Sequence, residues 1–274
     1  MKLYHDHNAV CCQKVELALF EKKIAYDEII VSLFNSEQYS FEYLKINPRG
    51  IVPTIVDNGN TIIESTVICE YIDDAYSGNN LMPDEPFDKA TARVWMKLVD
   101  EEIHEAGSTL SFCAMFRDRM LSMPLEEREK RYVNVGNPIR EEMYRSSVDM
   151  GVDAPVAFRA IASYEMMIRD LEAHLSKSVS KWIAGAHYSL ADLALTPYFA
   201  RIEYLGLIEL WTTGRPSVMQ WWNRVKDRES FREVFTSALS PDDIDRMRSS
   251  GARIYDRVKE RREEYLAANV KAVP

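Results

Sequence analysis

The sequence predicts a small α/β domain at the N-terminus followed by an all-helical domain. Strand and helix patterns alternate over residues 1–76, whereas only helical periodicity appears after residue 87. Residues 77–86, between these parts, contain Ser77-Gly78-Asn79-Asn80 and Pro83-Asp84-Glu85-Pro86, which are typical of a linker. With 274 residues and 46% hydrophobic content, the chain can bury two cores. We therefore expect domains at 1–80 and 87–240, with a charged helical extension at 241–274.

The elements of the N-terminal domain follow from the spacing of its apolar residues. The pattern predicts a strand, a helix, a second strand, a proline-containing strand, a turn, a short strand and a second helix. In chain order, the first strand spans Lys2 to His5, the first helix about Cys11 to Lys22, and the second strand Tyr26 to Val31. The proline-containing strand spans Ile51 to Val56, the turn Asp57 to Asn60, and the short strand Thr61 to Ile63, and the second helix begins at Glu64.

Pro53 lies between two β-branched apolar runs, although proline fits poorly in a central strand because it donates no hydrogen bond to a neighbouring strand. We expect the backbone to bend here. If the Val52–Pro53 peptide bond is cis, Val52 turns its main-chain N–H and C=O outward. The resulting edge can pair with another peptide as an added strand.

Glu64-Ser65-Thr66 opens a segment with helical spacing, so these residues should lie at a helix N-terminus. The hydroxyl and N–H groups of Ser65 and Thr66 would form an anion site there, and Glu64 would meet an ammonium group. A purely structural alternative is that Ser65 is only the helix N-cap and Glu64 a solvated first-turn acid.

Helical periodicity runs through most of the remaining chain. It predicts helices at Phe87 to about Phe116, Pro155 to Leu175, Leu190 to Leu207, and Ser217 to Arg228. Residues 122–153 contain Gly136, Pro138 and Gly151, and are expected to form an irregular, polar cap over a cleft. The charged tail from Pro241 to Pro274 is most simply interpreted as a solvated terminal helix, with covering of the cleft or contact with a neighbour as alternatives.

The composition excludes several classes of partner. A formal charge of -9 argues against nucleic acid or an anionic membrane, because phosphate groups need a basic face. No apolar run reaches the ~18 residues of a membrane span, and Lys2-Leu3-Tyr4 follows Met1 without a leader, so we expect a cytoplasmic protein. Four cysteines without CxxC spacing favour reduced thiols over disulfides or zinc.

A capping motif near residue 189 is the most specific local pattern. Ser189 and Asp192, three residues apart, form a variant of the capping box, and Tyr188 can pack as its hydrophobic staple. Leu190 and Leu193 should then enter the core. We interpret this motif as structural, because the loss of a cap costs ~1 kcal/mol of stability and no chemistry.

Three segments, Ile51-Val52-Pro53, Glu64-Ser65 and residues 185–192, together resemble the motifs of cytosolic glutathione S-transferases. The resemblance covers most of the chain. It implies a thioredoxin-like N-terminal domain, an all-helical C-terminal domain, a homodimer, and glutathione as co-substrate. Val52 would pair with the glutathione backbone, while Glu64 and Ser65 would hold its γ-glutamyl end.

Three further segments resemble the bacterial branch of this family that contains lignin β-etherases, which cleave β-aryl ethers with glutathione. These are residues 45–50, residues 64–71 and Arg93-Val94-Trp95. The insert at 122–153 is also similar in placement to the insert of those enzymes.

The group that activates the glutathione sulfur is expected between His5 and Val15, where the family places a tyrosine, serine or cysteine. No serine is present there, but Cys11 and Cys12 lie at the start of a helix whose positive end lowers thiol pKa values. Cys11 matches the cysteine of the reductive dehalogenases in the family, and Cys12 a serine of the etherase-like pattern. We prefer Cys11, and expect one of the two to be a buried packing residue.

Other polar residues near these motifs carry weaker signals. Tyr4 matches the tyrosine of mammalian-type transferases and ranks third, while Asn8 is a weak candidate for a hydrogen bond to the sulfur. The resemblance places Gln38 near the glycine carboxylate of glutathione, with Arg49 second, although either could be an ordinary surface residue. His5 and His7 show no metal-ligand spacing, so no metal is expected and both histidines should be solvated.

The second substrate is expected to bind between the domains, against the helix after the linker. His104, Ser108, Ser111 and Met115 follow helical spacing there and form a mixed polar and apolar face suited to a small hydrophobic or aromatic electrophile. The glutathione thiolate would attack this electrophile, by conjugation or by β-aryl ether cleavage. One alternative is a cysteine-dependent glutathione lyase, reductive dehalogenase or thiol-disulfide oxidoreductase; another is a non-catalytic transferase-like binding module.

Overall fold

Four short strands form one mixed sheet in the computed structural model, which describes residues 1–269. The strand order is β2-β1-β3-β4; β1 runs parallel to β2 and antiparallel to β3, and β3 runs antiparallel to β4. The strands are β1 (Lys2–His5), β2 (Asp27–Ile30), β3 (Thr54–Asp57) and β4 (Asn60–Ile63). A strand is therefore present near each predicted position, but β3 begins at Thr54 and does not include Pro53 as expected.

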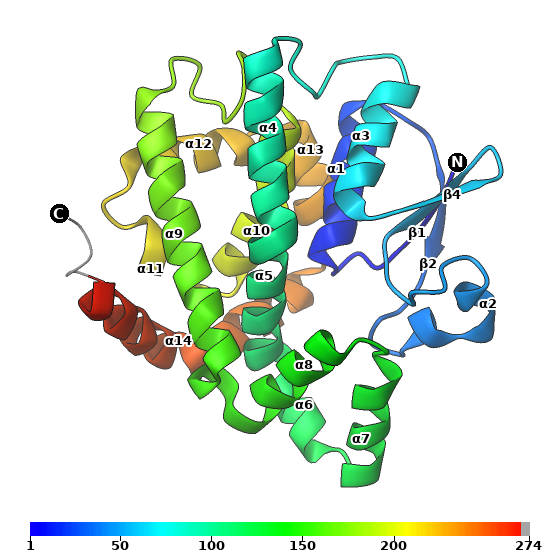
Figure 1. Cartoon of the computed structure of the whole chain (residues 1–274), viewed down its shortest axis with the longest axis vertical. Helices are drawn as coiled ribbons and strands as arrows, with labels where there is room; N and C mark the ends of the chain where they lie inside the picture. The colour runs from blue at the N-terminus through cyan, green and yellow to red at the C-terminus, as the bar shows by residue number, and fades with distance from the viewer. Residues whose placement is uncertain (270–274) are drawn as a thin grey trace. The chain divides into compact units, whose positions relative to one another are not determined.

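The hairpin between β3 and β4 turns at Asn58 and Gly59, which both have positive φ angles, of 50° and 81°. This is the backbone that an Asn-Gly pair favours in a two-residue hairpin, and it confirms the predicted turn. Helices α1 (Val10–Glu21) and α3 (Ser65–Ala75) lie side by side against the sheet (Figure 1). The short helices η1 (Glu37–Tyr39) and α2 (Phe41–Leu44) lie between β2 and β3 in the chain.

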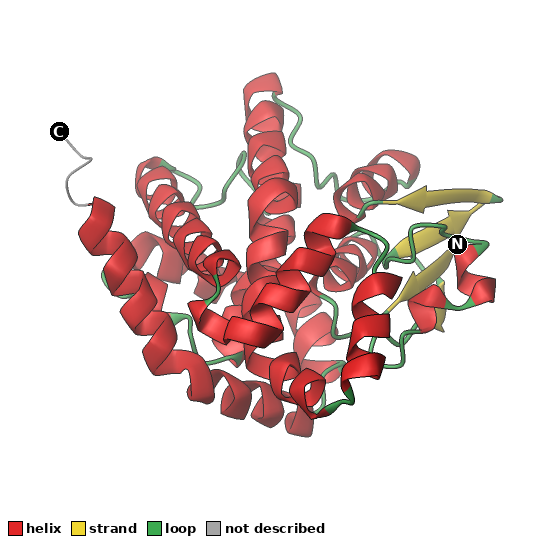
Figure 2. Ribbon diagram, turned by 60° about the horizontal axis from the view of Figure 1, so that its bottom comes forward, coloured by secondary structure: helices red, strands yellow, loops and turns green. Residues whose placement is uncertain are grey.

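All described elements after residue 76 are helical (Figure 2). The prediction of an α/β part followed by an all-helical part is confirmed. None of the described helices is both long and apolar enough to cross a bilayer. The helices are α4 (Pro86–Leu98), η2 (Val99–Ile103), α5 (His104–Ser111), η3 (Phe112–Phe116), α6 (Arg117–Ser122), α7 (Leu125–Asn134), α8 (Pro138–Met150), η4 (Gly151–Asp153), α9 (Pro155–Lys177), α10 (Leu190–Tyr204), α11 (Glu209–Thr212), α12 (Pro216–Lys226), α13 (Glu229–Phe231), η5 (Arg232–Ser237) and α14 (Pro241–Asn269).

The chain forms two compact units, each built from segments that are not contiguous in the sequence. Unit 1 contains residues 1–100, 174–197 and 220–240, and therefore the whole sheet with α1 and α3. Unit 2 contains residues 101–173, 198–219 and the chain from residue 241 on.

The capping motif near residue 189 lies in unit 1, and the predicted pairing of Ser189 with Asp192 is present. Asp192 is fully buried, and its carboxylate accepts hydrogen bonds from Ser189 N and Oγ at 2.9 and 2.8 Å. It also accepts from Ile183 N at 3.0 Å and from Trp221 Nε1 at 2.8 Å. Asp192 thus joins the start of α10 to two other segments of the unit.

The prediction that residues 122–153 are irregular is wrong, because α7 and α8 lie there in unit 2. Pro138 is the first residue of α8, where its missing N–H costs nothing, and Asn137 caps the helix by accepting a hydrogen bond from Arg140 N at 3.1 Å. The ring of Tyr144 stacks on Phe112 with centroids 4.7 Å apart. The insert is therefore packed on its own unit through an aromatic contact.

The C-terminal extension is helical as predicted, but it is not simply solvated. One face of α14 is buried in unit 2, with Met247 2% exposed and Val258 fully buried. Arg253 donates to Ala114 O at 3.2 Å, and Arg262 pairs with Glu165 at 2.6 Å. Residues 270–274 of the predicted extension lie outside the described residues.

Candidate active site

Cys11 and Cys12 lie in the first turn of α1, but only Cys11 is partly exposed; Cys12 is fully buried. The Cys11 thiol donates to the main-chain carbonyl oxygen of Val52 at 3.3 Å. Ala9, the residue before the helix, provides no side-chain cap. The helix therefore keeps its N-terminal N–H groups and their partial positive charge close to Cys11.

The two thiols titrate in opposite directions. The interaction with Cys12 lowers the pKa of the Cys11 thiol; burial opposes this shift, and the Lys14 ammonium group adds to it. Burial raises the pKa of Cys12 well above its ordinary value. Cys11 is therefore the thiol suited to form a nucleophile, and Cys12 is suited to packing, as expected for one of the pair.

Two buried polar side chains donate hydrogen bonds to the segment that contains Val52. The Val52–Pro53 peptide bond is cis. Asn47 donates to Ile51 O at 2.9 Å, and Tyr43 donates to the same oxygen at 2.6 Å. Burial raises the pKa of Tyr43 to about 12, so its hydroxyl keeps the proton that it donates. The sequence reasoning missed Asn47 and Tyr43, although an Asn-Pro pair before a bent segment is a usable signal.

The N-terminus of α3 contradicts the alternative in which Ser65 is the N-cap of the helix. Glu64 is the N-cap residue, with φ 69° and ψ 110°, and Ser65 is the first residue of the helix. Such a positive φ is unfavourable for a residue with a side chain. The Glu64 carboxylate pairs with the Arg49 guanidinium, so the two candidates meet, with both side chains more than half exposed. Neither is a free solvated charge.

Gln38 lies in η1 and is only 9% exposed, so it is not an ordinary surface residue. Its side-chain oxygen is buried and receives no hydrogen bond from residues 1–269. Gly50, with φ +59°, lies against this element: a Cβ there would be 3.2 Å from Gln38 O and 2.9 Å from the Tyr39 ring. The close approach brings the loop before Val52 onto the Gln38 segment.

A buried lysine connects α1 to α3 within unit 1. Lys14 is 1% exposed, and its Nζ donates to Thr66 Oγ1 at 2.7 Å and approaches Asp100 Oδ1 at 3.3 Å. Thr66 also donates to Asp100 at 2.7 Å. The buried ammonium is thus neutralised by a carboxylate and hydrogen-bonded. Nothing in the local sequence marked Lys14 or Asp100 as partners.

The four residues predicted to contact the second substrate lie on α5 and η3 of unit 2. His104 Nδ1 and Tyr198 Oη are 3.0 Å apart, and His104, Ser108 and Met115 are partly exposed. Ser111 differs because it is buried. Its hydroxyl donates to Gly107 O at 2.6 Å and accepts from Arg201 at 3.1 Å, so its hydrogen bonds are made inside the unit.

The remaining candidates near α1 have mixed outcomes. The prediction of solvated histidines is wrong for His5, which is fully buried at the end of β1, while the His7 side chain is 37% exposed. Tyr4 packs against Tyr43 with ring centroids 5.9 Å apart. Asn8 is exposed, and its main-chain N–H donates to Asp6 at 2.9 Å.

Comparisons with known proteins agree on one family. The models of the glutathione S-transferase N-terminal and C-terminal domains match residues 10–75 and 152–224. Protein LigF of Sphingobium sp. strain SYK-6 is 30% identical over 250 residues, which cover 88% of this chain and 95% of LigF. The tetrachloro-p-hydroquinone reductive dehalogenase of Sphingobium chlorophenolicum is 28% identical over 239 residues, covering 84% and 94% of the two chains.

A solved structure also matches. The crystal structure of the β-etherase LigF from Sphingobium sp. strain SYK-6 aligns with a TM-score of 0.77 at 30% sequence identity. The alignment covers 86% of this chain and 98% of that one.

Proposed function

The chain belongs to the glutathione S-transferase family, and we propose that it uses the thiolate of glutathione to attack a small aromatic electrophile. The observation that carries this proposal is the contact between Cys11 Sγ and Val52 O at 3.3 Å. It brings a thiol with a lowered pKa to the main-chain segment at which we expect a peptide to pair as an added strand. Glutathione is such a peptide, and strand pairing at Val52 would bring its sulfur to the N-terminus of α1.

Two further groups would hold the ends of glutathione. The N–H groups at the start of α3, with the Ser65 hydroxyl, suit the γ-glutamyl carboxylate, and Glu64 suits its ammonium group. Gln38 suits the glycine carboxylate, because a half-turn of its amide would place the NH₂ donor at the position of the unpaired oxygen. Arg49 pairs with Glu64 and would orient the Glu64 carboxylate rather than contact glutathione itself.

In this reaction the glutathione thiolate attacks the electrophilic carbon, a C–S bond forms, and the bond to the leaving group breaks. A β-aryl ether would release a phenolate that takes a proton from solvent. The helix end and the docking of both reactants would supply the rate enhancement, by stabilising the thiolate and removing an entropic barrier of several kcal/mol. The names of the matched β-etherase and reductive dehalogenase favour an aromatic substrate. His104 and Ser108 are our predicted contacts for it.

A second candidate reaction uses Cys11 covalently. Cys11 would attack the sulfur of a glutathione adduct, forming a Cys11–glutathione disulfide while the released carbon takes a proton. The thiolate of a second glutathione would then attack the glutathione sulfur of this disulfide. This step releases the Cys11 thiolate and oxidised glutathione. The lowered pKa of the Cys11 thiol favours this route.

Exposure to oxidised glutathione without reductant, followed by intact mass and peptide mapping, tests the placement of Cys11. We expect one glutathionyl group on Cys11, lost in Cys11→Ser and kept in the matched Cys12→Ser variant. An adduct mainly on Cys12, Cys69 or Cys113 would contradict the assignment. If no adduct forms but turnover persists in Cys11→Ser, catalysis proceeds by conjugation or ether cleavage without a covalent cysteine.

The rival hypothesis, a non-catalytic binding module, is tested at the other end of the site. Replacing Ser65 with Ala should weaken glutathione binding roughly 10-fold or more, since a hydrogen bond to a charged group contributes about 1.5–3 kcal/mol. The exposed Ser77→Ala variant is the matched control. A wild-type protein that binds no glutathione in calorimetry would favour the module. We also propose that the protein is a homodimer, which light scattering would test, and that it is cytoplasmic, which fractionation of the cells that produce it would test.

A further inference from the structure

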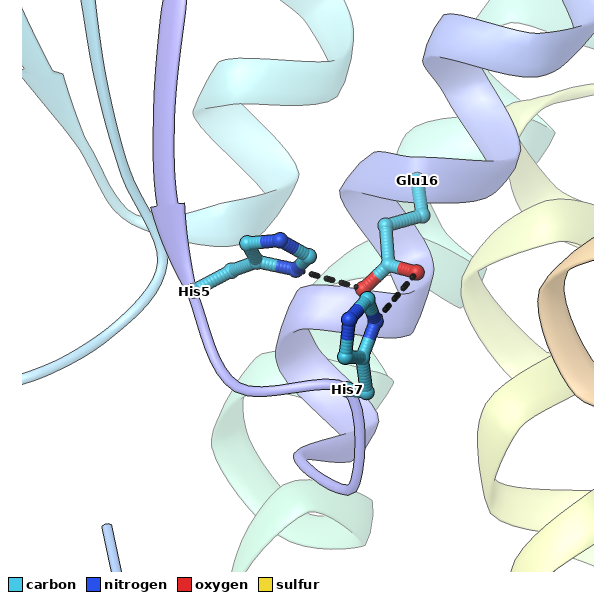
Figure 3. A group of neighbouring side chains, drawn as sticks. All are labelled: His5, His7 and Glu16. Atoms are coloured by element: carbon cyan, nitrogen blue, oxygen red, sulfur yellow. Dashed lines mark hydrogen bonds and ion pairs between the residues drawn. The ribbon is translucent and has the colours of Figure 1, made fainter. Parts of the chain in front are cut away.

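A cluster of three metal-ligating side chains lies beside the α1 N-terminus, outside the proposed glutathione contacts. His5 ends β1, His7 lies in the following loop, and Glu16 lies on α1. Figure 3 shows both rings turned toward the Glu16 carboxylate. His5 Nδ1 is 2.8 Å from Glu16 Oε1, His7 Nδ1 is 3.7 Å from Glu16 Oε2, and one ligand atom from each residue falls within 4.8 Å of the others.

A second carboxylate lies on the other side of both rings. Glu28, on β2, has its Oε1 3.1 Å from His5 Nε2 and 3.6 Å from His7 Nε2. Four ring nitrogens therefore face carboxylate oxygens, yet two neutral imidazoles carry only two N–H groups between them. Two of the four approaches then set a nitrogen lone pair against an oxygen lone pair. The arrangement calls for additional positive charge, either protons or a metal ion.

We propose that His5, His7 and Glu16 bind a divalent transition-metal ion, with zinc as the expected species. Two imidazoles and one carboxylate, with one position left for water, is a common set for four-coordinate zinc. Ligand bonds of about 2.0–2.1 Å place neighbouring ligand atoms roughly 3.4 Å apart in a tetrahedron. One ligand atom from each residue already lies within 4.8 Å of the other two, so these atoms need to approach one another by at most about 1.4 Å to reach that spacing.

Three observations support a bound cation here, and the first and third of them favour a metal over protons alone. The Nδ1 atom of His7 is buried and has no hydrogen-bond partner within residues 1–269, although it points at the cluster. Glu16 is only 6% exposed, and a buried carboxylate needs a compensating cation. Glu28 can accept the Nε2–H of both rings, which is the outer contact that leaves Nδ1 unprotonated for a metal.

The surroundings give the ion a path in and a structural role. The His7 and Glu28 side chains are 37% and 45% exposed, so the cluster is open to solvent on that side. A bound ion would tie the end of β1 and the loop after it to the second turn of α1. Because Gln13 also donates to His7 O at 2.8 Å, the ion would hold the loop that leads to Cys11. This role does not depend on the proposed reaction.

The test uses the full chain, stripped with a chelator and kept reduced at pH 7.5. Calorimetry with Zn²⁺ should show one site per chain, and Co²⁺ should give the visible absorption of a four-coordinate nitrogen and oxygen site. His7→Ala and Glu16→Gln should each weaken binding at least 10-fold, as should Glu28→Gln through the outer contact. His187→Ala, an exposed histidine elsewhere in unit 1, is the matched control and should bind normally.

Several outcomes would overturn the proposal. Absence of Zn²⁺ binding at tens of micromolar would leave protons as the only compensating charge. Strong sulfur-to-cobalt charge-transfer bands that disappear in Cys11→Ser would move the metal to the thiols. The cobalt spectrum of the unmodified protein decides between these ligand sets even if a cluster variant fails to fold.

Discussion

Replacing Gly251 with Ala should destabilise the protein, although alanine is the better helix former. Gly251 lies in the middle of α14, where alanine is favoured over glycine by about 1 kcal/mol. A Cβ at this position would be 1.8 Å from Leu205 O and 2.6 Å from its carbonyl carbon. Both neighbouring atoms belong to the backbone and cannot rotate away. Reaching an ordinary contact of 3.4 Å requires α14 to move by about 1.6 Å.

The magnitude depends on the contacts that this movement disrupts. It would stretch the bond from Arg253 to Ala114 O, now 3.2 Å, and the pairing of Arg262 with Glu165, now 2.6 Å. Overpacking of this kind costs about 1–3 kcal/mol, and we take the upper end because backbone is involved. Subtracting the helix-propensity gain leaves a loss of about 2 kcal/mol. In a chain of this size that lowers Tm by roughly 4–8 °C.

Thermal and urea unfolding measure this loss, with limited proteolysis reporting whether α14 detaches. Ser249→Ala, exposed in the same helix, is the matched control and should change stability by less than about 0.5 kcal/mol. If Gly251→Ala is as stable as the wild type or more so, helix propensity decides at this position. The close packing of α14 on Leu205 would then be wrong.

Two further predictions concern a reactive thiol and a buried carboxylate. Because the pKa of the Cys11 thiol is lowered from the ordinary 9.0, its alkylation by iodoacetamide should stay fast as the pH falls below 9.0. The Cys12→Ala variant should move the midpoint of this pH–rate profile to higher pH, and an unchanged midpoint would exclude Cys12 as the cause of the lowered pKa. Asp192→Ala should lower stability by roughly 3–5 kcal/mol in urea unfolding, because the N–H groups of Ile183 and Trp221 lose a buried acceptor, and a loss below about 1 kcal/mol would contradict the capping network.

The sequence was sufficient for the sheet and its flanking helices because their signals are local. Alternating apolar residues, the Asn58-Gly59 turn and Pro53 each act over a few neighbours. Pro138 misled the prediction because a proline breaks a helix interior but favours a helix start, and only the residues after it distinguish the two cases. Those residues are too polar for hydropathy to distinguish a helix from a loop.

The burial of α14 could not be predicted for a different reason. Its buried face includes Ser250 and Gly251, which are small rather than apolar. Close approach of a helix to another backbone needs small side chains, so the contact leaves no hydrophobic stripe in the sequence. The helix therefore read as solvated although it packs on unit 2.

The sequence motifs indicated the separate segments of the candidate site, but the spacing of residues along the chain does not show which side chains meet. Neighbouring residues on a helix differ in direction by about 100°, so the spacing could place Cys11 and Cys12 at the helix start without deciding which one faces Val52. The histidine cluster was missed altogether, because its carboxylates lie eleven and twenty-three residues from His5 and meet it only across the sheet and helix.

Lys14 indicates how the two ends of the proposed glutathione site are held at a fixed spacing. Cys11 lies in the first turn of α1, and Ser65 is the first residue of α3, so a ligand that binds at both helix starts depends on how these helices are joined. Lys14 lies one turn after Cys11, and Thr66 directly follows Ser65. The buried 2.7 Å hydrogen bond from Lys14 to Thr66 therefore joins the two helix starts, and Thr66 in turn donates to Asp100. A buried charged contact is costly to break, because it would leave an ammonium group unpaired. The spacing between the proposed sulfur and γ-glutamyl ends of the site is thus set by packed helices rather than by loops.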